Sequence, residues 1–537
     1  MAKSRKRFHR LGQSKLTCSK ANSDRVSTPD SILLTQYSII NRSSMIQSLD
    51  SCPEWDICII GGGATGLATA LDAASRGLKT ILFEQYDFAK GTSSRSTKLV
   101  HGGVRYLQQG NIKLVMEALR ERGLLLQNAP HLVHNQAFIV PNYKWWEKPF
   151  YGIGLKIYDR MAGKLGLGPS ELLSKKETLQ LVPALDPTDL RGAVRYHDGQ
   201  FDDARLAISM AMTAAGKGAV VLNYFPVKAL LKMQKKICGV WVKDECTGKE
   251  YEVRSKTVIN ATGVFTDTVL RMDDPKHENI ISPSQGIHLV VNREFLAADT
   301  AIMIPRTDDG RVLFAVPWHH KVVLGTTDTA VERISEEPVP LQEEIDYILT
   351  HIGRYLTRDP GVSDIKTVFA GLRPLIKGKQ RKTAALSRDH LVSVSSSGLI
   401  SISGGKWTTC RKMAEDVVNV AIEQSGLSAT ACITHQLRLD SFDIRKPVFS
   451  IEELSEADLR STLRHCIEQE MCLTVEDFLS RRTRQLLLDA RIAIERAPVI
   501  ARMMAEEMKK DEEWISEQIN IFIQLAMHYL PTHHPLP

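Results

Sequence analysis

The chain has 537 residues, 43% of them hydrophobic and 24% charged, which is the balance of a globular protein with two or three domains. Its net charge of +7 arises within residues 1–44, which hold nine Lys or Arg and two Asp or Glu, whereas the remainder holds 60 of each. No run of 18 apolar residues is present, so no transmembrane helix is predicted, and the neutral remainder argues against nucleic-acid binding, which needs clustered positive charge.

The basic N-terminal segment, residues 1–50, lacks the apolar region of a secretory signal. It is rich in Lys, Arg and Ser and poor in acids, which is also typical of a mitochondrial transit peptide. We expect instead a disordered extension, or an upstream start codon with Met45 as the true start. The nine cysteines form no C-x-x-C pair and no metal-ligand spacing appears, so the sequence predicts reduced thiols and no metal site.

The stretch Asp56–Glu84 has the order of a dinucleotide-binding unit: a strand, a glycine turn, a small-residue helix, a second strand and an acid. Ile57–Ile60 is a short apolar run suited to a buried parallel strand. The glycines of the G-x-G-x-x-G pattern are Gly61, Gly63 and Gly66. They predict a tight turn, close approach of the backbone to a pyrophosphate, and close packing of the helix on the strand. Glu84 follows Gly61 by 23 residues, where a carboxylate accepts ribose hydroxyls.

The middle of the chain alternates helices with strands. A polar Gly/Ser/Thr segment spans residues 91–107, and residues 137–195 carry several prolines, which predict an insertion of irregular structure and short helices. Predicted helices are Asn111–Asn128, Asp203–Gly216 and Thr408–Gln424. Predicted strands are Ala219–Tyr224, Val227–Met233, Gly239–Glu245, Thr257–Ala261, Val312–Trp318, Lys321–Gly325 and Leu399–Ser403.

From about residue 450 the pattern becomes helical throughout. The predicted helices are Glu456–Met471, Thr474–Asp489 and Asp511–Tyr529. Thr474 and Asp477 stand three apart at a helix start, as in a capping box with Asp in the usual Glu or Gln place. The simplest interpretation of Arg481, Arg482 and Arg484 is a solvated helix face, with acidic lipid headgroups or the other domain as alternative contacts.

The order of segments favours FAD over NAD as the dinucleotide. The fingerprint occurs once, and the chain returns to the same sheet much later through Asn260-Ala261-Thr262-Gly263 and again through Gly404-Gly405. A flavin is long, so distant segments must hold its ring end, and Gly263 and Gly404-Gly405 suit close approach of the backbone. The helix after Gly405 directs its positive end at this region, which favours an anionic reduced flavin.

Six segments together resemble the FAD-dependent glycerol-3-phosphate dehydrogenase family, in order, from about Trp55 to the C-terminus. They read GGGATG, TSSRSTKLVHGGVRYL, NATG, GTTD, AGLRPL and GGKWTTCRKMAE. The resemblance implies an α/β fold with a Rossmann-like FAD-binding domain of the glutathione-reductase/amino-acid-oxidase type. The implied domains are a discontinuous FAD-binding domain (51–125, 196–280 and 371–430), an antiparallel-sheet substrate or cap domain (126–195 and 281–370) and a C-terminal all-helical domain (445–537).

The resemblance also implies a reaction and its residues. The family oxidises sn-glycerol 3-phosphate to dihydroxyacetone phosphate, with FAD taking the C2 hydride and passing electrons to membrane quinone. The implied catalytic residues are His288 as general base, Arg373 and Lys406. The implied substrate-binding residues are Arg105, Tyr106 and Arg388. The predicted FAD-binding residues are Gly61, Gly63, Gly66, Glu84, Thr92, Ser93, Ser96, Lys98, His101, Gly263, Gly404, Gly405 and Thr408.

A quinone-linked enzyme must reach the membrane, so a peripheral protein on the inner face of the cytoplasmic membrane is expected, with a mitochondrial location less favoured. The segment Lys144–Gly154, with Trp145 and Trp146, has the aromatic and basic mix of a membrane interface, although buried packing explains it equally well. A homodimer is left open. The alternatives are a flavin oxidase that uses oxygen, an amine or amino-acid oxidoreductase, and an FAD-dependent scaffold or tRNA-modifying partner, which the neutral charge disfavours.

Overall fold

The computed structural model describes residues 40–108, 110–377, 390–440, 451 and 454–531. The N-terminal extension predicted for residues 1–50 is described only at its end. There the prediction of disorder is wrong, because Arg42–Ser51 forms helix α1, which buries Met45 and Leu49 and is capped by the Asn41 side chain. Arg42 of this helix pairs with Asp244 at 2.5 Å.

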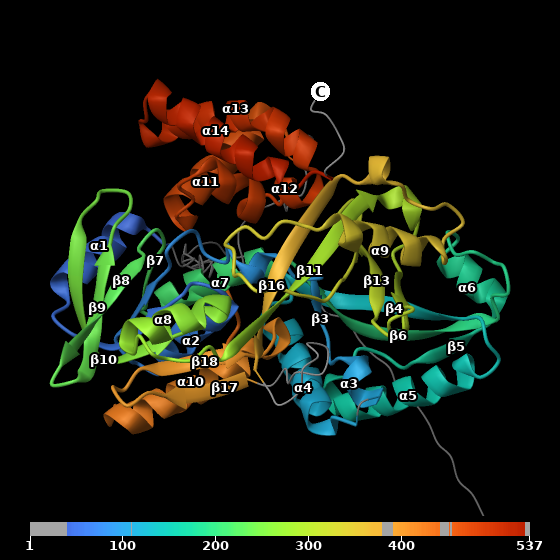
Figure 1. Cartoon of the computed structure of the whole chain (residues 1–537), viewed down its shortest axis with the longest axis horizontal. Helices are drawn as coiled ribbons and strands as arrows, with labels where there is room; N and C mark the ends of the chain where they lie inside the picture. Colours follow the sequence, from blue (N-terminus) through green and yellow to red (C-terminus); the bar gives the residue numbers. More distant parts are fainter. Residues whose placement is uncertain (1–39, 109, 378–389, 441–450, 452–453, 532–537) are drawn as a thin grey trace, which may run out of the picture. The chain divides into compact units, whose positions relative to one another are not determined.

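The first sheet has eight strands, and its central strands are parallel (Figure 1). Along the sheet they run β17 (His390–Val394), β18 (Ile400–Gly404), β10 (Glu250–Asn260), β1 (Trp55–Ile60), β2 (Thr80–Phe83) and β7 (Val220–Leu222), with β8 (Val227–Met233) and β9 (Lys236–Lys243) joined to β10. Strand β1 lies between β2 and β10, parallel to both. Segments about 200 and 350 residues apart therefore end at one edge of the sheet, as predicted.

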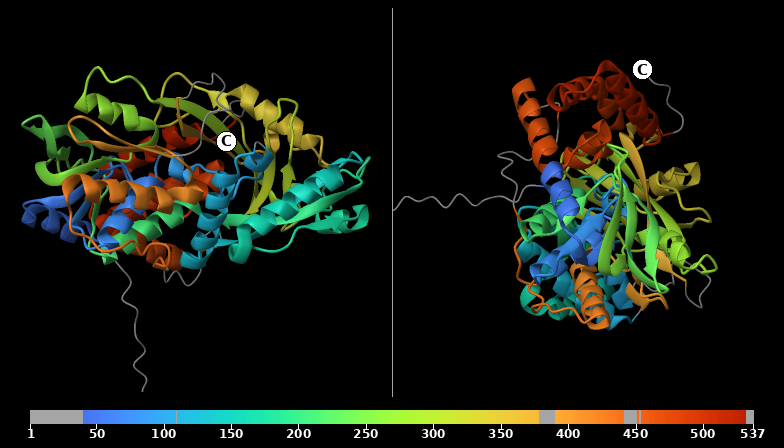
Figure 2. Two further views of the ribbon diagram at one scale, coloured as in Figure 1. Left: turned by 90° about the horizontal axis from the view of Figure 1, so that it is seen from below. Right: turned by 90° about the vertical axis from the view of Figure 1, so that its left-hand side faces the viewer.

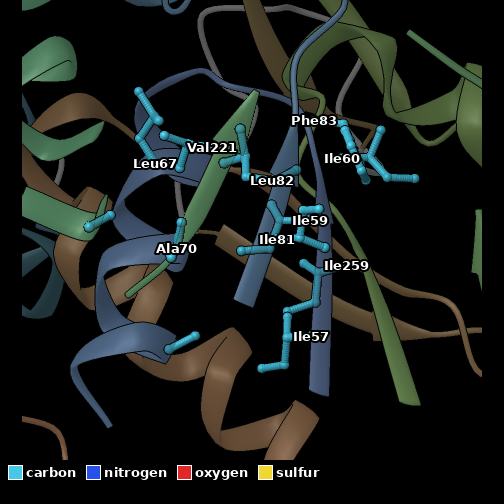
Figure 3. Packing of buried hydrophobic residues seen from close by; sticks show 14 of the residues in the cluster. Ile57, Ile59, Ile60, Leu67, Ala70, Ile81, Leu82, Phe83, Val221 and Ile259 are labelled. Carbon is cyan, nitrogen blue, oxygen red and sulfur yellow. The ribbon is translucent and has the colours of Figure 1, made fainter. Parts of the chain in front are cut away.

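Helix α2 (Ala64–Ser75) covers these central strands and is buried over most of its length. Figure 3 shows Leu67 and Ala70 of α2 close to Val221 and Leu82, with Ile59 and Ile259 in the neighbouring strands. Small residues let the helix approach the sheet closely, and each fully buried Ile or Leu contributes about 1.5–3 kcal/mol. Helices α7 (Asp203–Gly216), α8 (Thr266–Asp273) and α10 (Cys410–Ser425) complete the helices around this sheet.

The second sheet has ten strands and is largely antiparallel. Its strands are β15 (Thr329–Ala330), β11 (Ile281–Asn292), β14 (Lys321–Gly325), β13 (Leu313–Trp318), β12 (Ala301–Ile304), β4 (Val133–Asn142), β6 (Gly192–Phe201) and β3 (Leu99–Val100), with β16 (Thr367–Ile376) on β11 and β5 (Glu171–Leu173) on β6. Helices α3 (Val104–Gln108), α4 (Ile112–Asn128), α5 (Glu147–Ala162), α6 (Lys175–Leu181) and α9 (Gln342–Gly353) pack around it. The hairpin predicted at Lys321–Gly325 is confirmed as β13–β14.

The prediction of irregular structure and short helices over residues 137–195 holds for the short helix α6 but is wrong for the strands and for α5. Strands β4 and β6 pair without a break from Val133–Phe201 to Asn142–Gly192, and α5 runs for 16 residues between them. The prolines do not interrupt these elements, because Pro141 lies at the end of the ladder, and Pro149 lies in the first turn of α5, where a helix needs no backbone N–H.

The C-terminal helices pack on the second sheet, at the top of Figure 1 and in red in Figure 2. They are α11 (Glu456–Glu470), a π-helical turn (Asp477–Arg482), α12 (Gln485–Leu488), α13 (Ala490–Met508) and α14 (Glu512–Met527). The backbone N–H of Val368 in β16 donates to the Tyr529 carbonyl at 2.8 Å. The Thr474–Asp477 capping box is confirmed, since Asp477 accepts the Thr474 N–H and Thr474 accepts the Asp477 N–H.

Two features of this region differ from prediction. The single helix expected over Thr474–Asp489 is divided, because Arg484 adopts a left-handed φ of 68° between the π turn and α12. Helix α13 was not predicted, because Pro498 interrupts its pattern, yet it continues through the proline. Among the described residues, no helix is both long and apolar enough to cross a membrane.

Candidate cofactor and substrate site

A cavity of about 490 Å³ opens where the parallel strands of the first sheet end. It is lined by residues that follow β1, β2, β10 and β18 in turn. Its lining includes Gly61, Gly63, Ala64, Glu84, Thr92, Ser93, Gly263, Gly404, Gly405, Lys406 and Trp407. The carboxyl edge of a parallel sheet is the usual place for a nucleotide, so the cavity lies where the fold predicts one.

The glycine turn makes room for backbone at one end of the cavity. Gly61 has a φ of +107°, and a Cβ there would lie 2.8 Å from the Ala261 carbonyl oxygen. A Cβ on Gly66 would lie 1.8 Å from the Gly61 oxygen, so Gly66 serves helix–strand packing and does not line the cavity. Gly63, the N-cap of α2, has no side chain, and the Ala64 N–H donates to the Ser93 hydroxyl at 2.9 Å, so the start of the helix and this hydroxyl line the cavity together. This arrangement suits a pyrophosphate.

Glu84 lies beside the glycine turn. Its carboxylate accepts the Gly62 N–H at 2.6 Å and the Tyr86 N–H at 3.0 Å. Burial raises the pKa of Glu84, and these two backbone hydrogen bonds oppose that shift. The carboxylate is thereby held at the cavity wall as an acceptor for hydroxyl groups.

At the other end, the cavity is closed by the turn after β18. Gly404 and Gly405 have φ values of +76° and +73°, and a Cβ on Gly405 would lie 2.3 Å from the Met413 sulfur. The Trp407 indole N–H donates to the Ser93 carbonyl at 2.8 Å. The Lys406 ammonium lies 4.0 Å from the centroid of the Tyr106 ring. A cation therefore stands at the ring end of the cavity.

Four predicted FAD-binding residues lie behind the cavity wall and not in its lining. Ser96 and Lys98 both bind Asp203, the serine hydroxyl at 2.7 Å and the buried ammonium at 2.8 and 2.9 Å. The His101 N–H donates to the Thr408 hydroxyl at 3.2 Å. The structure thus engages Ser96 and Lys98 in an internal ion-pair cluster, and direct contact of these side chains with FAD is not supported.

His288 and Arg373 come from neighbouring strands of the second sheet. In the β11–β16 register, His288 stands opposite Phe369 and Arg373 opposite Ser284. Arg373 lies between Leu372, whose carbonyl accepts the Thr92 hydroxyl at 2.6 Å, and Pro374, which lines the cavity. Neither side chain is in the lining of the cavity; strand β16 reaches the cavity at Pro374, next to Arg373.

The His288 ring is confined and neutral. It is 3% exposed, and it stacks on Phe369 with the ring centroids 4.8 Å apart. Its Nε2 lies 2.8 Å from the Thr97 hydroxyl. Burial, followed by the charges of Arg373 and Lys98, lowers the pKa of His288 well below its ordinary value. A neutral imidazole is the form that accepts a proton.

The Arg373 guanidinium is held mostly by neutral groups. It donates to the carbonyl oxygens of Gln285 at 3.2 Å and Thr327 at 2.9 Å, and Asp328 lies 3.5 Å away. Gly286 makes room for it, because a Cβ there would lie 2.2 Å from a guanidinium nitrogen. The contacts given for this cation are thus with two carbonyl oxygens and with the carboxylate of Asp328.

Two predicted substrate residues fall outside the described part of the chain. Arg388 lies in the segment 378–389, and the side chain of Arg105 is not among those described. Their roles stay predictions.

The interpretation of Arg481, Arg482 and Arg484 as a solvated face is wrong, because all three are buried. Arg481 and Arg482 bind Asp87, in the segment after β2, and Arg484 binds Asp202 at 2.6 Å. The alternative contact with another domain is the one found. No spacing rule pointed to Asp87, Asp202 or Asp203 as partners, since each ion pair joins residues far apart in sequence.

The donor set fits FAD. One cavity is lined by the start of α2, by the Glu84 carboxylate, and by the glycine turn after β18 with Lys406. When bound there, FAD supplies a two-electron acceptor.

Known proteins with similar sequences are FAD-dependent oxidoreductases, which agrees with a cavity suited to FAD. A family model described as FAD dependent oxidoreductase matches residues 56–411, and one described as the C-terminal domain of alpha-glycerophosphate oxidase matches residues 446–515. A mitochondrial glycerol-3-phosphate dehydrogenase of Bos taurus is 39% identical, with 91% of this chain and 76% of that protein covered. Its counterpart in Schizosaccharomyces pombe is 34% identical, with 88% and 87% covered.

Among solved structures, the glycerol-3-phosphate dehydrogenase from Bacillus halodurans complexed with FAD matches with a TM-score of 0.75 and 30% identity, covering 93% of this chain and all of that one. The predicted fold class and the FAD cofactor are confirmed. The expected location at a cytoplasmic membrane is wrong, because the curated relatives are named mitochondrial. By sequence and by structure, the chain belongs to the family of FAD-dependent glycerol-3-phosphate dehydrogenases.

Proposed function

We propose that the chain oxidises sn-glycerol 3-phosphate to dihydroxyacetone phosphate, with FAD in the 490 Å³ cavity as hydride acceptor. The observation that carries this proposal is a buried histidine, His288, beside the cation Arg373 of the neighbouring strand, with a second cation, Lys406, in the lining of the cavity. A small dianionic alcohol needs fixed cations for its phosphate and a base for its hydroxyl.

The roles follow from the chemistry of each side chain. His288 accepts the proton of the C2 hydroxyl as the C2 hydrogen leaves with its electron pair. Lys406 lies nearest the ring end and stabilises negative charge developing on the C2 oxygen. Arg373, together with Arg105, Tyr106 and Arg388 from the resemblance, binds the phosphate.

The first experiment is anaerobic mixing of the FAD-loaded protein with sn-glycerol 3-phosphate. We expect loss of the oxidised flavin absorbance at about 450 nm. No change is expected when glycerol or an amino acid replaces the substrate. The inactive control is His288→Gln. An oxidised spectrum that persists with glycerol 3-phosphate but is bleached by an amino acid would transfer the chain to the amino-acid-oxidising class.

We further propose that the electrons leave to a quinone. Oxygen is the rival acceptor, because one matched family model is described for a glycerophosphate oxidase. Re-oxidation of the reduced protein by a short-chain quinone, much faster than by dissolved oxygen, is the expected result. Stoichiometric hydrogen peroxide and no quinone reduction would select the oxidase.

Quinone is dissolved in the membrane, so we propose that helix α5 provides a peripheral contact. Ile153 is 64% exposed, and Phe150 and Ile157 lie on the same face of α5 at helical spacing; Trp145, just before the helix, is 77% exposed. In the view from below, α5 is the uncovered teal helix (Figure 2, left). The basic residues Lys144, Lys148 and Lys156 lie in the same stretch of sequence. Exposed aromatic and aliphatic residues with basic neighbours are typical of an interfacial helix.

Vesicle co-sedimentation tests this contact. Trp145→Ala with Ile153→Ser is expected to reduce binding to anionic vesicles at least about tenfold, since each buried apolar side chain contributes about 1.5–3 kcal/mol. The matched control is Met233→Ser, an exposed apolar residue on β8. Equal binding by both variants would contradict the assignment.

A mitochondrial location is proposed from the names of the relatives, and the basic, Ser-rich residues 1–39 agree with a transit peptide. Fusion of residues 1–50 to a fluorescent reporter tests it, with a control in which the Lys and Arg residues are replaced by Gln. A cytosolic reporter would contradict this role of the segment. A homodimer stays a prediction.

A further inference from the structure

The His288 ring is held on two faces, so only its hydrogen bonds decide which nitrogen carries the proton. Phe369 stacks on one face with an interplanar angle of 19°. On the other strand, a Cβ at Gly325 would lie 2.4 Å from the His288 Cδ2, so only glycine leaves space for the ring. Nε2 contacts the Thr97 hydroxyl, whereas Nδ1 is buried and has no hydrogen-bond partner among the described residues.

Thr97 belongs to a short segment that is tied to one carboxylate. Asp203 accepts the Ser96 N–H at 3.1 Å and the Ser96 hydroxyl at 2.7 Å. It also binds the Lys98 ammonium, which in addition donates to the Ser94 carbonyl at 2.7 Å. The residues on both sides of Thr97 are thus anchored at a single point.

This anchor is an ion pair that water does not reach. The side chains of Lys98 and Asp203 are both 0% exposed. Lys98 adopts a left-handed φ of +63°, a conformation that an L side chain rarely takes unless its surroundings hold it. Its ammonium lies 5.0 Å from the centroid of the Trp318 ring and 5.1 Å from that of Phe369, the ring on which His288 stacks. The pair therefore lies directly behind the histidine and not in the cofactor cavity.

We propose that Thr97 is a positioning residue for His288, and that the Lys98–Asp203 ion pair holds the Thr97 hydroxyl against the ring so that Nε2 carries the hydrogen. The Nε2–H then donates to the Thr97 oxygen, and the lone pair on Nδ1 accepts the C2 hydroxyl proton. A hydroxyl can donate or accept, but a hydrogen on Nδ1 would be a buried donor without a partner among the described residues, so the contact favours the hydrogen on Nε2. The role assigned to Nδ1 rests on the proposed function; the tautomer itself does not.

The charges around the ring support this arrangement. Arg373 on β16 and Lys98 in the anchored segment both oppose protonation, and with burial they lower the pKa of His288. The ring consequently stays neutral before substrate binds, so a definite tautomer exists to be set. The negative charge of a bound phosphate would favour the imidazolium at the moment when the proton is transferred.

The test compares Thr97→Val, which removes the hydroxyl and keeps the shape, with Thr97→Ser, which keeps the hydroxyl. The matched control is Thr178→Val, because Thr178 is also a threonine whose hydroxyl makes one hydrogen bond, at 2.7 Å to the Ser174 carbonyl, and it lies on α6. The first readout is ¹⁵N NMR of the histidine rings in the FAD-loaded full chain without substrate, with His288 assigned by comparison with His288→Gln. We expect a single Nε2–H tautomer in the native protein, Thr97→Ser and Thr178→Val, and a mixture in Thr97→Val.

The second readout is the rate of flavin reduction by glycerol 3-phosphate as a function of pH. Thr97→Val is expected to be slower by about 10- to 100-fold, a part of the about 10²–10⁴-fold that a general base contributes. Its acid limb should also move along the pH axis, because the hydrogen bond no longer supports one protonation state. Thr97→Ser should recover to within about threefold of the native rate, as expected when only the hydroxyl matters.

The ion pair is tested by Lys98→Met with Asp203→Asn, which removes both charges and leaves neither partner buried alone. A mixed tautomer in this folded double variant supports the anchor, and an unchanged tautomer overturns it. An unchanged tautomer and an unchanged pH profile in Thr97→Val overturn the role of Thr97. If glycerol 3-phosphate does not reduce the native flavin, the proposed function fails, and the NMR result still decides the positioning.

Discussion

Two sets of buried or half-buried arginines in this chain are held in opposite ways. Arg481, Arg482 and Arg484 bind carboxylates of Asp87, Asp477 and Asp202, so each positive charge is neutralised inside the protein. Arg373 is held by carbonyl oxygens, with one carboxylate at 3.5 Å, and its side chain is 20% exposed. A cation compensated by carboxylates supports the fold, whereas a cation positioned by neutral groups keeps its charge for an anionic ligand.

The largest expected effect concerns Arg373, the arginine held mainly by neutral groups. Arg373→Met should lower kcat/KM for glycerol 3-phosphate by about 10²–10³-fold, because a phosphate would lose its charge-assisted hydrogen bonds, a loss of about 3–4 kcal/mol. The free energy of unfolding should change by less than for a fully buried ion pair, about 1–3 kcal/mol, since the half-buried Arg373 loses hydrogen bonds to neutral groups and a 3.5 Å contact with Asp328. Steady-state kinetics and urea unfolding measure both. Arg373→Lys is the matched control, which keeps the charge and loses the fork.

Arg482→Met should show the reverse pattern. Removal of this arginine leaves Asp87 and Glu470 buried with less compensation, so we expect a loss of about 3–5 kcal/mol in the free energy of unfolding. The folded fraction should keep kcat/KM within about threefold, because Arg482 does not line the cofactor cavity. A variant that stays stable and loses activity would break the contrast.

Acid should weaken the compensated cluster before the rest of the fold. Burial alone would raise the pKa of Asp87, but the charges of Arg482 and Arg481 lower it to about 2. A lowered folded-state pKa means that this stability is complete above the unfolded pKa, about 3.9, and is lost as pH falls toward 2. The loss from Asp87 is about 2 kcal/mol by this linkage. Thermal unfolding midpoints between pH 5 and pH 2 test it, and Arg482→Met should show a shallower decline.

The smallest expected effect concerns an exposed pair on the same helical region. Arg464 of α11 contacts Glu507 of α13 at 2.8 Å, and its side chain is half exposed. Arg464→Met should change the free energy of unfolding by less than about 0.5–1 kcal/mol, because solvent screens such pairs. Urea unfolding beside Arg482→Met makes the comparison direct. A loss as large as that of Arg482→Met would show that burial does not decide the contribution.

The glycine turn, the acid at Glu84 and the return through Gly263 and Gly404–Gly405 were predictable because each depends on backbone conformation and on short sequence spacing. Antiparallel pairing over Val133–Phe201 was not, because the prolines in this stretch lie at strand ends and in a first helical turn, where they are tolerated. The carboxylate partners of the buried arginines could not be predicted from the sequence either. A run such as Ser-Arg-Arg-Thr-Arg looks the same whether water or a distant carboxylate surrounds it, so burial decides what the composition leaves open.

Asp202 and Asp203 are neighbours in the sequence, and each forms an ion pair with a residue far away in the chain. Asp202 binds Arg484 of the C-terminal helices, and Asp203 binds Lys98 behind His288. A displacement of the start of α7 would move both carboxylates, because Asp202 is its N-cap and Asp203 its first residue. The C-terminal helical region therefore helps to fix the position of the start of α7 through Arg484. Removal of the C-terminal helices would take Arg484 away from Asp202, and the resulting change at the start of α7 would reach the Lys98–Asp203 pair behind His288.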